Sequence, residues 1–168
     1  MGLIMRVMVV VVAGLSTLPA GALSSRTAND RESATVTYCD LIRNPERYKG
    51  KLVRVSAIYR YGYEWSELYC LECMNEGRTW VEFDESYVSS TKASIRKKIG
   101  GNGFKGRTVR VLMVGRFASG GAYGHMGAYR FRFLVSRLEK ADVILNDSPS
   151  ANALPKAVLS RIHCPSSK

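Results

Sequence analysis

Residues 107–117, RTVRVLMVGRF, contain the alternation that decides the fold class. In an extended chain, apolar side chains at odd positions lie on one face, opposite the charged Arg110 and Arg116. A period of two is typical of a half-buried β-strand. The segment therefore predicts a mainly β protein, with one face of this strand formed by Val109, Val111, Met113 and Phe117.

The segment just before this strand, GNGFKG (101–106), has the glycine spacing of a dinucleotide-binding loop. Such a loop needs a strand before it and a helix after it, so that helix N–H groups point at the pyrophosphate. Here the order is reversed, because a helix is predicted over Ser89–Ile99 and a strand follows. We interpret the glycines as a helix stop and a turn, and we expect no cofactor.

Further segments with strand character lie on both sides of 107–117. Alternation or aromatic residues predict strands over 51–61, 64–71, 78–84 and 129–138. A short helical lead-in is predicted over Tyr38–Tyr48, where Asn44 can cap and Pro45 suits the first helical position. The resulting order predicts a small five-stranded OB-like antiparallel barrel with one helix between strands 3 and 4. A five-stranded sheet with a covering helix would give the same order.

A resemblance to known proteins supports the barrel and is carried by four stretches. They are NPERYKGKLVRVSAIYRYG (44–62), TWVEFD (79–84), FKGRTVRVLMVGRF (104–117) and YGHMGAYRFRFLVSRLEKADVI (123–144). They resemble uncharacterised exported bacterial proteins of the OB-fold-like, or tRNA anticodon-binding-like, superfamily. The resemblance spans roughly the whole predicted domain and rests on fold-marking motifs. It implies a barrel and an envelope or secreted location, and no established activity.

The N-terminus has the pattern of a secretory signal peptide over residues 1–22. Arg6 precedes an apolar run from Val7 to Leu15, and Ala20-Gly21-Ala22 is an A-x-A-type cleavage site. The run is shorter than the roughly 20 residues that a spanning helix needs, so we expect no transmembrane segment after signal removal. A secreted or periplasmic protein follows, with flexible segments over 23–34 and 146–168 around a barrel domain over 35–145.

Charge is distributed unevenly along a basic chain of net charge +11. Residues 62–85 contain seven acidic residues and one basic residue, whereas 86–138 contain eleven basic residues and no acidic residue. The asymmetry could mark a polyanion-binding face. The interpretation that we favour is that acidic and basic strands lie side by side and neutralise one another.

A ligand-binding face can be suggested from the arginines at outward strand positions. Arginine planes beside aromatic rings suit single-stranded nucleic acid or other polyanions. However, OB-folds bind across their second and third strands, which carry the acidic residues here. Nucleic acid is therefore not the favoured partner of this face, which comprises Arg54, Arg60, Arg110, Arg116, Arg130, Arg132 and Tyr129.

Four cysteines in an exported chain predict structural disulfides. Three pairings are open, and we favour Cys39 joined to Cys70 or Cys73, with Cys164 attaching the tail. Nearby glutamates disfavour a reactive thiolate in the C-x-x-C pair. A metal site is not expected, because Cys39 and Cys164 do not form a second closely spaced pair.

No catalytic residue is predicted. His125 is interpreted as a loop residue that hydrogen-bonds locally, because no nucleophile and acid at recognisable spacing accompany it. The sequence predicts an exported, non-enzymatic binding or structural module whose partner is a protein or an envelope glycan. The alternatives are a polyanion or single-stranded nucleic-acid binder and, least favoured, a secreted enzyme.

Overall fold

The computed structural model describes residues 35–100, 106–146 and 163–164. The predicted signal peptide and N-terminal flexible segment lie outside these residues, as do 101–105 of the glycine-rich segment and most of the predicted tail. The described part is mainly β, which confirms the predicted class at that level. Its strands are β1 (Thr35–Thr37), β2 (Leu52–Tyr61), β3 (Ser66–Tyr69), β4 (Thr79–Phe83), β5 (Arg107–Tyr123) and β6 (Tyr129–Asn146).

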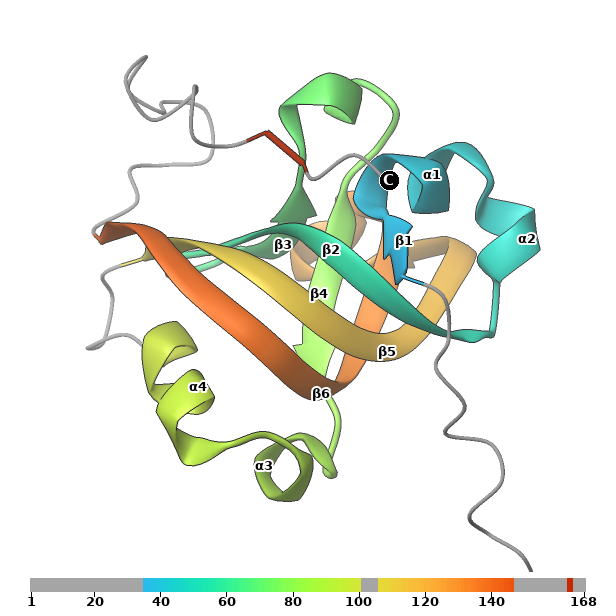
Figure 1. The fold of residues 1–168 in the computed structure, drawn as a ribbon. Coiled ribbons are helices and arrows are strands. Elements are labelled where there is room, and N and C mark those ends of the chain that lie inside the picture. The colour runs from blue at the N-terminus through green and yellow to red at the C-terminus, as the bar shows by residue number, and fades with distance from the viewer. Residues whose placement is uncertain (1–34, 101–105, 147–162, 165–168) are drawn as a thin grey trace, which may run out of the picture. The chain divides into compact units, whose positions relative to one another are not determined.

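Strands β1 to β6 form one mixed sheet in the order β1-β2-β3-β4-β6-β5, and β2 also pairs with β5 (Figure 1). The pairings β1–β2 and β4–β6 are parallel, and the other four are antiparallel. Strand β2 pairs with both β3 and β5. The succession of paired strands β2-β3-β4-β6-β5 therefore closes on itself at β2. The sheet is not a regular barrel, since β3 and β4 have 4 and 5 residues while β5 and β6 have 17 and 18.

Two features correct the predicted set of five antiparallel strands. β1 adds a sixth strand, whose three residues are too few to show a periodicity. The parallel pairing of β4 with β6 joins segments that are far apart in the sequence, and a local hydropathy pattern carries no information on such partners.

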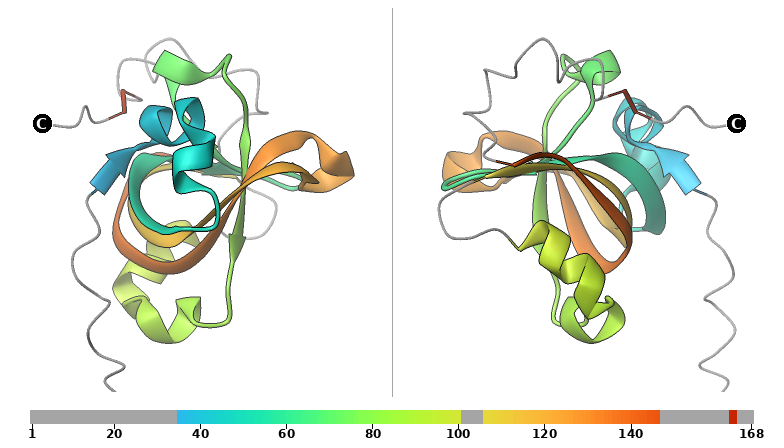
Figure 2. Two further views of the ribbon diagram at one scale, coloured as in Figure 1. Left: turned by 90° about the vertical axis from the view of Figure 1, so that its right-hand side faces the viewer. Right: turned by 60° about the vertical axis from the view of Figure 1, so that its left-hand side comes forward.

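The β5–β6 ladder is longer than the sequence predicted. The segment ASGGAYGHMG, expected as a connection, is largely strand, because β5 continues past Phe117 to Tyr123 before the short 3₁₀ turn η2 (His125–Gly127). Pairing of Ser119 and Tyr123 with β6 extends the strand on both sides of its glycines, which lie at a register shift of the ladder. The left panel of Figure 2 shows these paired strand ends projecting from the rest of the sheet.

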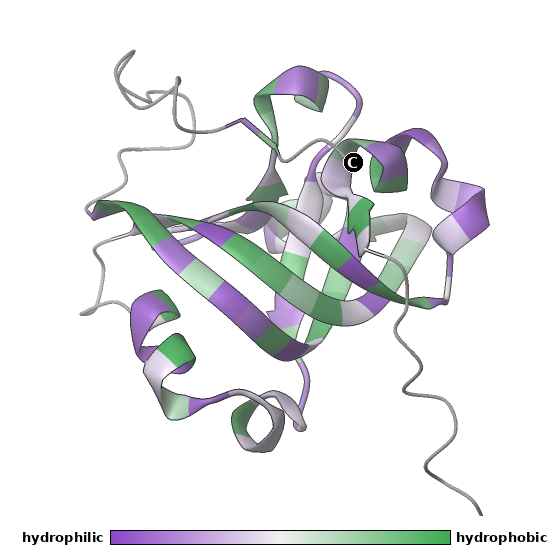
Figure 3. Ribbon diagram, viewed as in Figure 1, coloured by the Kyte–Doolittle hydropathy of each residue, from purple (hydrophilic) through white to green (hydrophobic). Residues whose placement is uncertain are grey.

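The core lies between the inward faces of the strands. The predicted inward residues of β2 and β5 are buried, and Figure 3 shows hydrophobic and hydrophilic residues alternating along the long strands. Their burial follows from the period of two, which directs alternate side chains away from water. The set comprises Val53, Val55, Ala57, Tyr59, Val109, Val111, Met113 and Phe117.

Short helices replace the two longer ones that the sequence suggested. The lead-in consists of α1 (Tyr38–Arg43) and α2 (Pro45–Tyr48), and the backbone N–H of Asp40 donates to Thr37 Oγ1 at 3.1 Å to cap α1. A second pair, α3 (Tyr87–Ser90) and α4 (Ala93–Ile99), packs against β6. A single helix over 89–99 does not form, because Thr91 is extended and its Oγ1 accepts the backbone N–H of Leu138 at 3.0 Å.

Gly115 allows β5 and β6 to approach at a register shift of their ladder. A Cβ atom at this position would lie 2.4 Å from the carbonyl oxygen of Leu134, a backbone atom that cannot rotate away. We expect Gly115→Ala to lower the free energy of unfolding by roughly 1–3 kcal/mol through overpacking. Gly100→Ala is the control, because its Cβ would have only an ordinary contact at 3.5 Å. Equal denaturation midpoints for the two variants would contradict the close approach.

Candidate functional site

A buried ion cluster joins strands β2 and β3 to the start of β4. Glu67 on β3 is 1% exposed and accepts from two guanidinium groups: Arg60 on β2, which is 3% exposed, and Arg78, whose Nε lies 2.8 Å from Glu67 Oε2. Arg60 also stacks on Tyr69, with 3.8 Å between its Cζ and the ring centroid. Arg60 compensates Glu67 in the interior, and the guanidinium of Arg78, which is 45% exposed, adds a second positive charge at the surface.

Tyr129 lies beside this cluster, in the interior. It is buried, and its hydroxyl accepts from Arg78 Nη2 at 3.2 Å. Burial raises the pKa of Tyr129, and the charge of Glu67 raises it further. Arg60 and Tyr129 were expected on an exposed ligand-binding face, and the structure corrects this: Glu67 compensates the buried charge of Arg60, and Arg78 donates to the buried hydroxyl of Tyr129.

The other arginines of the suggested face do not form one uncommitted basic surface. Arg54 Nε lies 2.7 Å from Glu139 Oε2, and Arg132 Nη1 lies 3.4 Å from Glu82 Oε2. Burial alone would raise the pKa of Glu139, but hydrogen bonds from Arg54 and Arg137 lower it. The Arg132–Glu82 pair joins the paired strands β6 and β4 and is of the kind that the sequence favoured, whereas Arg54 and Glu139 lie outside the acidic and basic segments 62–85 and 86–138.

The remaining three arginines of that set are exposed. Arg116 Nη1 donates to the carbonyl oxygen of Gly50 at 2.7 Å, and Arg130 Cζ lies 5.8 Å from the ring centroid of Phe131. Arg110 lies opposite Ile58 in the β2–β5 ladder. The six predicted arginines are thus divided between the interior, ion pairs and exposed strand positions.

An open groove of about 680 Å³ lies between the β2–β3 turn, strand β4 and the η2 turn. Tyr63, which is 71% exposed, and the rings of Trp65 and Trp80 give it aromatic walls. The sequence analysis missed this groove, because its walls come from segments far apart in the chain. It is lined by Gly62, Tyr63, Glu64, Trp65, Ser66, Trp80, Glu82, Gly124 and His125.

Two glycines hold the groove tryptophans in place. A Cβ on Gly62 would lie 2.4 Å from Trp65 Nε1, and a Cβ on Gly124 would lie 2.5 Å from Trp80 Cδ2. Gly124 also has φ +68, a left-handed conformation that favours glycine. Tyr129 supports Trp80 from the interior, with 5.0 Å between the ring centroids. Each indole is therefore packed against backbone.

The groove combines aromatic rings with carboxylates. Glu64 and Glu82 place acidic oxygens beside the tryptophans, and Glu82 is paired with Arg132. Such a surface can stack on a planar or apolar ligand face while accepting hydrogen bonds from hydroxyl or N–H groups. It is unfavourable for phosphates, which would meet like charge.

His125 lines the same groove from the η2 turn and is exposed. Its backbone carbonyl accepts the N–H of Ala128 at 3.2 Å, which is the local hydrogen bonding expected of a loop residue. Among the described residues, His125 forms no ion pair with an acidic side chain. Among these residues, no carboxylate is therefore ion-paired with His125 in the way that orients the histidine of a catalytic triad.

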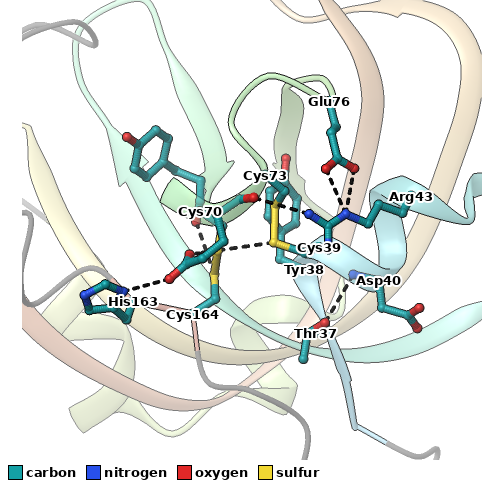
Figure 4. Close-up of a disulfide and its surroundings, with 12 residues drawn as sticks. Thr37, Tyr38, Cys39, Asp40, Arg43, Cys70, Cys73, Glu76, His163 and Cys164 are labelled. Carbon is teal, nitrogen blue, oxygen red and sulfur yellow. Dashed lines mark hydrogen bonds and ion pairs between the residues drawn. A yellow bond between two sulfur atoms is a disulfide. The ribbon is translucent and has the colours of Figure 1, made fainter.

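The cysteines form two disulfides, Cys39–Cys73 and Cys70–Cys164 (Figure 4). This confirms the prediction of structural disulfides, and Cys164 attaches its part of the predicted tail to the end of β3. His163 Nδ1 also lies 2.8 Å from Glu72 Oε1. Burial alone would raise the pKa of Glu72, but the hydrogen bond with His163 lowers it.

Comparison with protein-family models, curated proteins and solved structures finds no match. Within the described residues, no helix has the length and apolar character needed to cross a membrane.

Comparison of Gly124 with Gly120 separates two effects of a Cβ atom at position 124: displacement of Trp80 and backbone strain. Both residues have positive φ, but a Cβ on Gly120 would have only Lys49 Nζ, at 3.5 Å, within contact distance. We expect Gly124→Ala to lower stability by roughly 1–3 kcal/mol more than Gly120→Ala, because only the former displaces Trp80. Denaturation curves measure this difference, and a tryptophan emission change in the former variant alone would report the displaced ring.

The ion cluster is tested by Glu67→Gln. Removing this charge leaves the guanidinium of Arg60 buried without its carboxylate, so we expect a loss of roughly 3–5 kcal/mol in the free energy of unfolding. Glu76→Gln is the matched control, because its pair with Arg43 is largely exposed and should contribute under about 1 kcal/mol. Chemical denaturation of both variants gives the comparison, and similar losses would contradict a dominant buried cluster.

Proposed function

We propose that the protein is an exported, non-enzymatic binding module with an OB-like fold, and that its groove binds an envelope glycan. The observation that carries the proposal is the groove itself, where Tyr63, Trp65 and Trp80 lie beside Glu64 and Glu82. An open surface rich in aromatic residues is uncommon unless it binds something, because exposed rings are unfavourable in water.

The strand connectivity supports the OB-like assignment. Strands β2 to β6 correspond in order to the five strands of an OB-fold, with β2 paired to β5 and helices between β4 and β5. OB-folds bind oligonucleotides and oligosaccharides at their second and third strands and the adjoining loops. The groove lies at the equivalent strands, β3 and β4, and at the turns on either side.

The charge of the groove favours a glycan over a nucleic acid. The apolar faces of sugar rings can stack on the indoles, and sugar hydroxyls can donate to the carboxylates of Glu64 and Glu82. A phosphate backbone would instead approach two acidic side chains. The arginines that could attract it are partly neutralised, as in the pairs Arg54–Glu139 and Arg132–Glu82.

The two disulfides are compatible with export, because disulfides persist in oxidising compartments such as the periplasm and the exterior. The predicted signal peptide points to the same location. An envelope glycan is a polymer that an exported binding module would meet there.

A hydrolase is the second candidate, because the groove contains two carboxylates and a histidine. Glycoside hydrolysis requires one carboxyl group to remain protonated as the general acid. Glu82 is instead committed to an ion pair with Arg132 at 3.4 Å, and for this reason we favour binding without cleavage.

Tryptophan fluorescence offers a direct test, because both tryptophans of the chain line the groove. The mature oxidised protein would be titrated with lysozyme-released peptidoglycan fragments, chitohexaose and cellohexaose. We expect an emission change that saturates with at least one of them, and chromatography should recover that oligosaccharide intact. Cleaved products would identify a hydrolase instead.

Variants that keep both tryptophans locate the binding. Tyr63→Ala should weaken glycan binding by roughly 1 kcal/mol, about fivefold, through loss of one stacking ring. Arg110→Ala on β5 should leave it unchanged. Steeply salt-dependent binding of a labelled single-stranded oligonucleotide, weakened by Arg110→Ala and not by Tyr63→Ala, would overturn the proposal in favour of a polyanion binder.

A further inference from the structure

Four sulfur atoms from three separate parts of the chain converge beside the end of β3 (Figure 4). Cys39 comes from α1, Cys70 follows β3, Cys73 ends the 3₁₀ turn η1 (Leu71–Cys73), and Cys164 comes from the C-terminal segment. The two disulfides are in contact, since Cys39 Sγ lies 3.4 Å from Cys70 Sγ. The sulfurs of Cys39, Cys70 and Cys73 all lie within 4.8 Å of one another. We name these four residues the sulfur cluster.

We propose that the sulfur cluster of the reduced chain is a zinc site with four cysteine ligands. In tetrahedral zinc sites the Zn–S bonds are about 2.3 Å, which places neighbouring sulfurs about 3.8 Å apart. The 3.4 Å between Cys39 and Cys70 is near this spacing, Cys73 lies within 4.8 Å of both, and Cys164 is bonded to Cys70. Cys70-x-x-Cys73 supplies the short ligand spacing that structural zinc sites use, and the fold brings Cys39 and Cys164 to it.

The side chain of Glu72 provides a second observation. Its Oε2 lies 2.7 Å from Cys70 Sγ, a hydrogen-bond distance. Within a disulfide this sulfur has no proton to donate, so the contact suits the reduced thiol, which can donate to the carboxylate. Cys70, Glu72 and Cys164 also form a second group of ligand atoms within 4.8 Å of one another. Glu72 in turn contacts His163, the neighbour of Cys164 in the sequence, and so links the C-terminal segment to the residues around Cys70.

The surroundings suit a closed structural site. Cys39, Cys70 and Cys73 are buried, which would shield the metal from water. Four thiolates around Zn²⁺ carry two negative charges, and the guanidinium of Arg43 lies close by, donating to the carbonyl oxygen of Glu72 at 3.3 Å. The cluster therefore has two alternative states that join the same segments, two disulfides or one zinc ion.

A phosphine can serve as the reductant that converts the two disulfides to four thiols. Each disulfide reacts with one trialkylphosphine and one water molecule to give two thiols and a phosphine oxide. The four thiols then bind Zn²⁺ and release four protons, because thiolates are the ligands. In the reverse direction, two molecules of oxidised glutathione and four protons convert the four thiolates to the two disulfides, giving four molecules of reduced glutathione and free Zn²⁺.

The experiment uses the full chain, reduced with a trialkylphosphine, freed of the reagent and kept anaerobic. Zn²⁺ is added and the metal content is measured by native mass spectrometry. We expect about one zinc per reduced chain and none per oxidised chain. Co²⁺ in place of zinc should give the intense visible absorption of a tetrahedral thiolate site.

Variants identify the ligands. Cys164→Ser should lower the zinc content and shift the Co²⁺ spectrum, whereas His163→Ala, at the neighbouring position, should leave four-sulfur coordination intact. Near-ultraviolet circular dichroism follows folding throughout. The proposal is overturned if reduced wild-type protein takes up no zinc, if zinc fails to restore its tertiary signal, or if Cys70→Ser binds zinc as tightly as the wild type.

Discussion

The buried carboxylate of Glu67 is the constraint on which the site depends. A charge so far from water is tolerated only where opposite charges compensate it, so β2 and β3 must keep the register that faces Glu67 with Arg60. The same residue lies opposite Trp80 in the β3–β4 ladder. A slip by one residue would turn Glu67 to the other face and move Trp80 out of the groove. The aromatic surface is thus positioned by an ion cluster beneath it.

Much of the sheet could be predicted from local patterns, because a strand with water on one side and core on the other repeats every two residues. The buried residues of β2 and β5 follow that rule. β1 could not be found, since three residues show no period, and the parallel β4–β6 pairing depends on distant partners. Thr91 likewise interrupts a helical pattern through a hydrogen bond to Leu138, which only the folded chain reveals.

The site was less predictable than the sheet for the same reason. Arg60 was assigned outward because a lone charge in a strand belongs in water, yet a carboxylate on the neighbouring strand makes its burial favourable. The groove needs rings from two turns and a strand to meet, and no spacing in the sequence expresses that. The sequence pattern that could have pointed to the groove is that each tryptophan lies close to acidic residues, in YEWSE (63–67) and WVEFD (80–84). The cysteines were easier, because their number and the predicted export signal already indicate bridges.

The Cys70–Cys164 bridge spans 94 residues and the Cys39–Cys73 bridge spans 34. Because a chain is made from its N-terminus, the three cysteines of the first half are all present before β5 and β6 have been synthesised. Cys70 then has no native partner, while Cys39 and Cys73 are both close to it. Until Cys164 has been synthesised, any two of these three thiols can pair. The native partner of Cys70 becomes available only when Cys164 is added. Once closed, this bridge encloses β4, α3, α4, β5 and β6 in a covalent ring, so one backbone cut within the ring leaves the two pieces joined.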